Sequence, residues 1–196
     1  MHKTSKGFDF KFDVDYGKLH SFSDDGSYNC IDQTDDELIS LYGEIIDDDG
    51  KNVGSIKGYY AHNDGSFLSR SDNLSGDCYF VAETICDIKT GAVRSKYFSE
   101  RNFSERIFVL DQIVIDKEHR GKGIASTIIK NLPEVLNNQF DEDEPGFTIF
   151  LCASAMEKTN LGFDSEDYKK ETAHLVQFYK KHGYKLIKDN VMFYKD

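Results

Sequence analysis

The stretch FVLDQIVIDKEHRGKGIASTIIKNLPEVLNN, residues 108–138, decides the fold of this chain. Its first part, Val109 to Ile115, is rich in β-branched residues and predicts a strand. A basic, glycine-containing loop follows at Arg120-Gly121-Lys122-Gly123. Apolar residues at helical spacing come last: Ile124, Ile128, Leu132 and Leu136. Strand, loop and helix in this order predict an anion-binding site at the start of the helix.

Backbone chemistry favours an anion at this loop. The first amides of a helix have no partner within the helix, and the aligned peptide dipoles leave partial positive charge there. Gly121 and Gly123 lack a Cβ, so the main chain can come close to the anion and adopt positive φ. Arg120 and Lys122 add full positive charges. The glycine spacing fits neither the phosphate loop G-x-x-x-x-G-K-[ST] nor the dinucleotide motif G-x-G-x-x-G.

The loop instead resembles motif A of the GNAT superfamily of acyl-CoA N-acyltransferases, whose signature is [QR]-x-x-G-x-[GA]. Arg120, Gly123 and Ala125 occupy its fixed positions. Further along, AHLVQFYKKHGY at residues 173–184 resembles the family's motif B, A-x-x-x-[LF]-Y-x-x-x-G-[FY]. The pairs Phe178-Tyr179 and Gly183-Tyr184 match the spacing of that motif.

The resemblance implies a mixed α/β (α+β) fold of the GNAT type. Such a fold has a central mixed, mostly antiparallel sheet with a splayed central strand pair and with helices on both faces. The chain is then a single N-acetyltransferase domain, 1–196, with a variable N-terminal half, 1–105, and an acyl-CoA-binding core, 106–196. The co-substrate implied is acetyl-CoA, with no metal.

Residue by residue, the resemblance also implies the contacts with acyl-CoA. Main-chain groups of the central strand pair with pantetheine and the thioester carbonyl, which carries over to Ile113, Val114 and Ile115. The remaining cofactor-binding residues lie in the loop and the first helical turn: Arg120, Gly121, Lys122, Gly123, Ile124, Ala125 and Ser126. Many relatives have an asparagine near the end of the next strand, whereas Cys152-Ala153-Ser154 stands there in this chain and Asn160 comes later.

Two side chains are candidates for acid–base catalysis. The resemblance points to Tyr179 as the donor of a proton to the departing thiolate, and a phenol with a pKa of about 10 is protonated at neutral pH. Asp111, on the central strand, is the candidate base, acting through a water or by orienting a cationic amine. The alternatives are a core aromatic for Tyr179 and a salt-bridged strand residue for Asp111. Glu83 and Glu105 are weaker candidates for the base.

Composition bounds the partners. The chain has 196 residues and a net charge of −11, which disfavours nucleic acid and anionic membranes and suits a cationic substrate, although acidic residues also simply solvate a surface. The cysteines show no zinc spacing, and the N-terminus has no apolar signal sequence. We therefore expect a cytoplasmic protein with reduced thiols.

The expected activity is transfer of an acetyl group from acetyl-CoA to a primary amine, by direct attack in a ternary complex. The acceptor would be a small-molecule or peptide amine, with no nucleic acid and no membrane as partners, and a homodimer is left open. The alternative is a catalytically silent acyl-CoA-binding or interaction module on the same fold.

Outside the two motifs, hydrophobic periodicity predicts the remaining elements. Strands are expected at 8–14 and 147–151, and hairpins at 38–46 with 53–61 and at 184–187 with 191–194. Helices are expected at 75–88, capped by Ser75, and from Ser165 to Gly183. Loops are expected at 17–35 and 89–105, and Pro133 predicts a kink or break in the helix after the signature loop.

Overall fold

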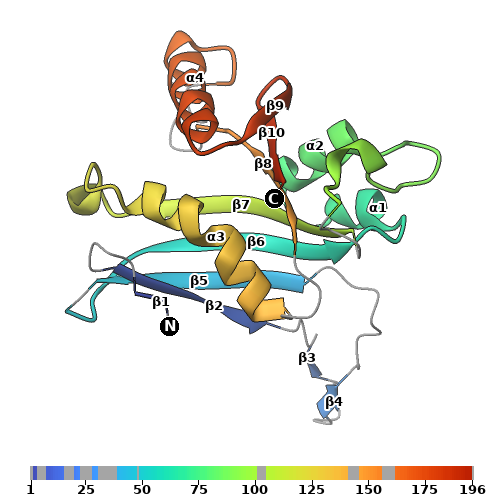
Figure 1. Ribbon diagram of the computed structural model, residues 1–196. Coiled ribbons are helices and arrows are strands. Elements are labelled where there is room, and N and C mark those ends of the chain that lie inside the picture. The colour runs from blue at the N-terminus through green and yellow to red at the C-terminus, as the bar shows by residue number, and fades with distance from the viewer. Residues whose placement is uncertain are drawn as a thin grey trace.

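The computed structural model describes residues 2–3, 8–15, 20–22, 28–30, 39–47, 49–100, 105–140, 146–155 and 162–195. Within them an eight-stranded sheet runs in the order β1-β2-β5-β6-β7-β8-β10-β9 (Figure 1). Its strands are β1 (His2–Lys3), β2 (Phe8–Asp15), β5 (Ile39–Asp47), β6 (Asn52–His62), β7 (Arg106–Ile115), β8 (Thr148–Cys152), β9 (Lys185–Lys188) and β10 (Val191–Lys195). A separate two-stranded sheet holds β3 (His20–Phe22) and β4 (Tyr28–Cys30).

Neighbouring strands of the large sheet are antiparallel except for β7 and β8, which are parallel. The sheet is therefore mixed and mostly antiparallel, as predicted. Both predicted hairpins are confirmed, because β5 pairs with β6 and β9 pairs with β10. The strands predicted at 8–14 and 147–151 are confirmed as β2 and β8.

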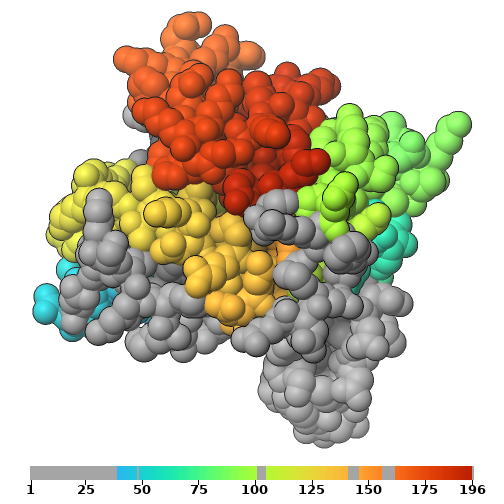
Figure 2. All heavy atoms as spheres, viewed as in Figure 1, coloured from blue at the N-terminus to red at the C-terminus, as the bar shows by residue number. Residues whose placement is uncertain are grey.

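Helices lie on both faces of the sheet. They are α1 (Phe67–Ser71), α2 (Gly76–Ile85), α3 (Ile124–Phe140) and α4 (Glu166–Lys181), with short 3-10 turns η1 (Ser95–Tyr97) and η2 (Lys117–His119). Alternation along β7 divides the core: Phe108 and Leu110 belong to the cluster with α3, while Ile107 and Val109 belong to the cluster with α1 and α2. In Figure 2 the C-terminal segment, orange to red, borders both α3 in yellow and the green segment that contains α2.

Helix α3 continues without interruption through Pro133. Of the kink or break predicted at Pro133, the break is therefore wrong and the kink stays a prediction, although proline has no amide hydrogen to donate within a helix. The physical reason is burial on both sides of the proline: Ile128, Leu132 and Leu136 are buried against the sheet. This apolar contact keeps the helix together despite one missing hydrogen bond.

Side-chain caps fix the starts of two of the predicted helices, α2 and α4. The Ser75 hydroxyl accepts a hydrogen bond from the Cys78 amide at the start of α2. The Ser165 hydroxyl accepts from the Tyr168 amide at the start of α4. Four short elements were not predicted: β1, α1, and the β3 and β4 strands within the expected loop 17–35. In addition, η1 lies inside the expected loop 89–105.

The central strand pair, β7 and β8, separates partway along β7. Parallel pairing of β7 with β8 extends from Ile107↔Thr148 to Leu110↔Leu151 and ends there, although β7 continues to Ile115. On the other side of β7, Lys57 pairs with Gln112 and Gly58 with Leu110, so Asp111 is the extra residue of a β-bulge. The bulge and the end of pairing fall at the same point, which opens the sheet between β7 and β8.

Candidate active site

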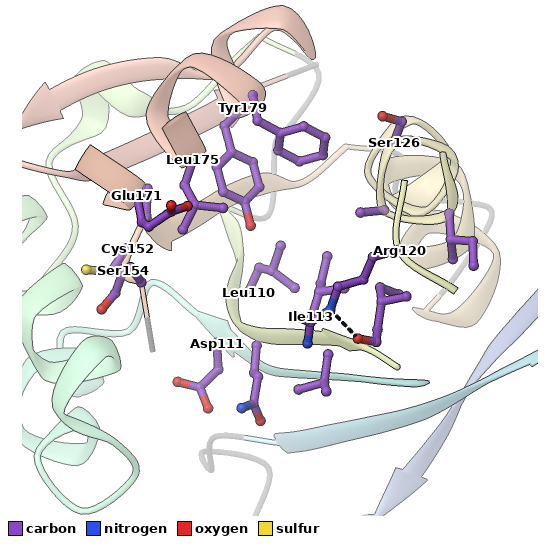
Figure 3. Close-up of a pocket in the computed structure, with 18 of the residues that line it drawn as sticks. Leu110, Asp111, Ile113, Arg120, Ser126, Cys152, Ser154, Glu171, Leu175 and Tyr179 are labelled. Carbon is purple, nitrogen blue, oxygen red and sulfur yellow. Dashed lines mark hydrogen bonds between the residues drawn. The ribbon is translucent and has the colours of Figure 1, made fainter. Parts of the chain in front are cut away.

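A cavity of about 600 Å³ lies where β7 and β8 part. Figure 3 shows Arg120 and Ser126 at one end, Asp111, Cys152 and Glu171 at the other, and the Tyr179 side chain entering from above. Every residue that the sequence assigned to the site lines this cavity except Lys122. The two sequence motifs, on β7–α3 and on α4, therefore face each other across one space.

The signature loop forms the basic end of the cavity. Gly121 and Gly123 both have positive φ, 75° and 84°, a conformation that residues with a Cβ rarely adopt. The Arg120 Nε donates a hydrogen bond to the Ile115 carbonyl at 2.8 Å, which ties the loop to the end of β7 (Figure 3). The Thr127 amide donates to the Gly123 carbonyl, so α3 begins at the second glycine. The loop can thus aim the first amides of α3 at an anion.

A contact between α3 and the end of α4 closes one side of the loop. The Ser126 hydroxyl, which faces the cavity, lies 3.2 Å from Nε2 of His182. The His182 ring also packs on Phe178, with ring centroids 4.9 Å apart. Partial burial lowers the pKa of His182. The hydrogen bond therefore joins the first turn of α3 to motif B, a pairing that no local sequence pattern predicts.

Tyr179 is half-buried and its hydroxyl points into the cavity (Figure 3). Its ring packs edge-on against Phe178 and Tyr184, with centroids 5.2 Å and 5.5 Å away. Burial raises the pKa of Tyr179 to about 12, and nearby Cys152 adds to that rise. The phenol is therefore protonated across the neutral range and can act as a proton donor.

Asp111 already has two partners. The Ser75 hydroxyl donates to one carboxylate oxygen at 2.6 Å, and the Lys57 Nζ lies 3.5 Å from the other. Only 11% of the Asp111 side chain is exposed, so its carboxylate interacts mainly with Ser75 and Lys57 and little with solvent. Since Ser75 also caps α2, Asp111 holds the start of that helix against the bulge. These contacts agree with the alternative prediction for Asp111, a salt-bridged strand residue.

Two acidic residues that the sequence did not single out also line the cavity, Asp77 and Glu171. Asp77 lies in the first turn of α2, and Glu171 lies on α4. The weaker candidates Glu83 and Glu105 do not line it; Glu83 is exposed and Glu105 accepts a hydrogen bond from Asn63. Asp77 comes two residues after the Ser75 cap, but only the packing of α2 beside β7 brings it to the cavity.

The end of β8 is held by Asn190, from the turn between β9 and β10. Its side-chain amide donates to the Cys152 Sγ and to the Ala153 carbonyl, at 3.2 Å and 3.1 Å. The Ala153 amide in turn donates to the Asn190 carbonyl. Burial is the largest cause that raises the pKa of the Cys152 thiol, which is therefore protonated. Asn160 lies outside the described residues.

A family profile described as "Acetyltransferase (GNAT) domain" matches residues 75–186, more than half of the chain. This chain belongs to the GNAT acetyltransferase family. The match includes α2 as well as both motifs and the whole cavity wall described above. Among curated proteins, none matches the chain.

Several solved structures resemble the chain at low identity. A mutant of the toxin AtaT bound to the C-terminus of the antitoxin AtaR is 11% identical, with a TM-score of 0.39, over 80% of this chain and 66% of that chain. The KacTA–DNA complex is 12% identical, with a TM-score of 0.40, over 95% and 93%. NAA60 of Arabidopsis thaliana in complex with acetyl-CoA is 8% identical, with a TM-score of 0.37, over 79% and 73%.

The chain thus spans about two thirds of the AtaT chain, 66% of its length. Likenesses of this strength carry no conclusion about substrate. DNA is named for the KacTA complex and a tRNA for a complex of AtaT, in each case for that protein alone, and our expectation of no nucleic-acid partner for this chain stays a prediction. Among the helices of the described ranges, none is both long enough and apolar enough to cross a membrane. Those ranges also hold no cluster of His, Cys, Asp and Glu suited to a metal ion.

Proposed function

We propose that this protein transfers an acetyl group from acetyl-CoA to a primary amine by direct attack in a ternary complex. The observation that carries the proposal is the distribution of charge in the cavity beside β7. A basic loop and a helix N-terminus lie at one end, carboxylates lie at the other, and the Tyr179 hydroxyl points into the space between (Figure 3). An anionic cofactor and a cationic acceptor would each meet complementary charge.

The acetyl-CoA would lie along β7, since the strand has no neighbour from β8 beyond Leu110. Main-chain groups of Ile113, Val114 and Ile115 are then available to pantetheine and to the thioester carbonyl, and the loop 120–126 to the pyrophosphate. A neutral amine attacks the carbonyl carbon, a C–N bond forms and the C–S bond breaks. Tyr179 donates its proton to the departing thiolate and regains a proton from the amine nitrogen.

The acceptor class that fits best is a small or peptide-borne primary amine that arrives as a cation. Asp77, Asp111 and Glu171 all line the acceptor end, whereas the described residues place one lysine, Lys57, beside them. An acidic acceptor would meet repulsion there. The net charge of −11 works in the same direction at longer range.

A panel of acceptors with measurement of thiol release tests the proposal. Acetyl-CoA is supplied with cationic, neutral and acidic amines, and CoA is quantified against amine-free controls. We expect turnover with cationic primary amines and little with acidic ones. Preference for neutral or acidic acceptors would remove the electrostatic argument.

The alternative function is a silent acyl-CoA-binding module. It predicts acetyl-CoA binding in calorimetry without thiol release for any amine. The Tyr179 hydroxyl favours the enzyme, because a module that only binds has no need of a proton donor directed into the cavity. Absence of acetyl-CoA binding at about millimolar ligand would contradict both functions.

A further inference from the structure

The acceptor end of the cavity holds carboxylates in unequal environments. Asp77, Asp111 and Glu171 each line the cavity, from α2, β7 and α4 respectively. A base for an amine needs an uncompensated carboxylate that a substrate can reach. The surroundings of each side chain decide which of the three meets this need.

Asp111 is the least available of the three. One oxygen accepts from Ser75 at 2.6 Å, and the other lies 3.5 Å from the ammonium group of Lys57. An incoming cation would compete with Lys57 for this oxygen. Protonation of Asp111 would also weaken the link to Ser75, which caps α2 through the Cys78 amide. These contacts suit a positioning role for Asp111.

Glu171 lies nearer to solvent. Its side chain is 48% exposed, and its carboxylate lies 3.9 Å from the imidazole of His174, on the next turn of α4. An exposed carboxylate is hydrated and screened, so it can attract a cation toward the cavity. Its exposed position suits attraction of the acceptor.

Asp77 differs from both. Within the described residues the groups that act on its carboxyl are Asp111 and the Cys152 thiol, and neither is a cation. Burial raises the pKa of Asp77, the Asp111 carboxylate raises it further, and the hydrogen bond with Cys152 opposes the rise in part. The same thiol lies close enough to Tyr179 to influence that phenol. Asp77, Cys152 and Tyr179 all line the cavity, and Cys152 lies at the end of β8 where the strands part.

Resting on the function proposed above, we propose that Asp77 is the catalytic carboxylate that receives the acceptor ammonium and removes its proton, with Asp111 as its positioning residue. The ammonium gives one proton to the Asp77 carboxylate and becomes a neutral amine. The amine nitrogen then attacks the thioester carbon. One of its two remaining protons replaces the proton that Tyr179 gives to the thiolate of CoA. Asp77 finally releases its proton to water.

The neighbouring titratable and charged groups influence how kcat/KM should depend on pH if Asp77 has this role. Asp111 on β7 and the Cys152 thiol on β8 act on Asp77 from the packed elements, the Cys78 thiol is its neighbour on α2, and Lys57 lies beside Asp111. Since Asp77 must be ionised to accept a proton, kcat/KM should fall as the pH drops through the raised pKa of Asp77. This acidic limb should disappear when the carboxyl is removed.

The test compares Asp77→Asn with Glu83→Gln, which removes a charge from an exposed residue of the same helix outside the cavity. We expect Asp77→Asn to lower kcat/KM for a cationic amine by about a hundredfold or more and to remove the acidic limb. Acetyl-CoA affinity should stay within about twofold of wild type. Glu83→Gln should match wild type, and Asp77→Glu should recover part of the loss if folding is intact.

Asp111→Asn separates the two carboxylates. A positioning role predicts a lower unfolding midpoint and a smaller loss of kcat/KM, with the acidic limb retained. Loss of the limb in Asp111→Asn together with a wild-type profile for Asp77→Asn would overturn the assignment and leave the proposed function standing. Absence of turnover in the wild type with every amine would overturn the proposed function and the role of Asp77 together.

Discussion

Tyr179→Phe is the sharpest test of the chemistry in the cavity. The substitution removes a hydroxyl and keeps a ring whose centroid lies 5.2 Å from that of Phe178 and 5.5 Å from that of Tyr184. Packing of α4 should therefore be unchanged. If the hydroxyl protonates the departing thiolate, kcat should fall by about a hundredfold, which corresponds to ~2.7 kcal/mol in activation free energy.

The pH profile adds a second expectation. Burial raises the pKa of Tyr179 to about 12. At pH 8 only about one molecule in ten thousand would carry the phenolate, so the donor stays protonated. Ionisation of Tyr179 should therefore produce no basic limb in the profile of kcat below about pH 10.

Single-turnover measurement of thiol release isolates the chemical step, and calorimetry with acetyl-CoA reports binding. Tyr184→Phe is the matched control: Tyr184 is a buried neighbour that does not line the cavity, and its hydroxyl has no hydrogen-bond partner within the described residues. We expect this control to keep kcat. A Tyr179→Phe protein with wild-type kcat when chemistry limits turnover would refute the role and make Tyr179 a packing residue.

Further predictions concern the loop, the helix cap and pH. Gly123→Glu places a carboxylate at a φ of 84° in the loop, so acetyl-CoA affinity should fall tenfold or more, about 1.4 kcal/mol. The control is Gly50→Glu, in a turn with a φ of 79° outside the cavity. Unchanged affinity in a folded Gly123→Glu protein would contradict the placement of the cofactor at this loop. Ser75→Ala removes the cap of α2 and the donor to Asp111, so urea unfolding should show a loss of about 1–2 kcal/mol. Burial lowers the pKa of His182 in the folded state, so the unfolded chain protonates first and the unfolding free energy should fall as the pH drops below about 6.5. His182→Gln should flatten this dependence, and an unchanged slope in urea titrations would count against it.

Local patterns predicted most of the elements because each has a cause close in sequence. The alternation in β2 and the apolar stripe of α3 follow from burial of one face. Ser75 and Ser165 mark helix starts through hydrogen bonds only three residues long. The glycines of the loop have the positive φ that their lack of a Cβ suggested. By contrast, α1, with five residues, is too short for a periodic signal.

The site was harder to predict where it depends on contacts between distant segments. Asp77 lies in a helix that was predicted from its apolar spacing and its cap, with no functional residue assigned to it. Its position near Cys152 follows from the packing of α2 against β8. The contact between Ser126 and His182 spans 56 residues. The β-bulge at Asp111 appears only when β6 pairs with β7, because a bulge is a property of two strands. Sequence spacing carries none of this information.

The position of the cavity follows from the one parallel step in the large sheet. A parallel pair needs a crossover, and α3 supplies it between β7 and β8. Parallel strands present their carboxyl ends at the same edge, so the loop after β7 and the segment after β8 must meet there. The helix that returns the chain begins at this edge as well, with its amides directed at whatever lies between the strands. When pairing stops at Leu110 and Leu151, this edge opens into a cavity whose floor is strand backbone and whose two ends carry opposite charge. Under the proposed function, a thioester cofactor and an amine would meet beside the bulge at Asp111.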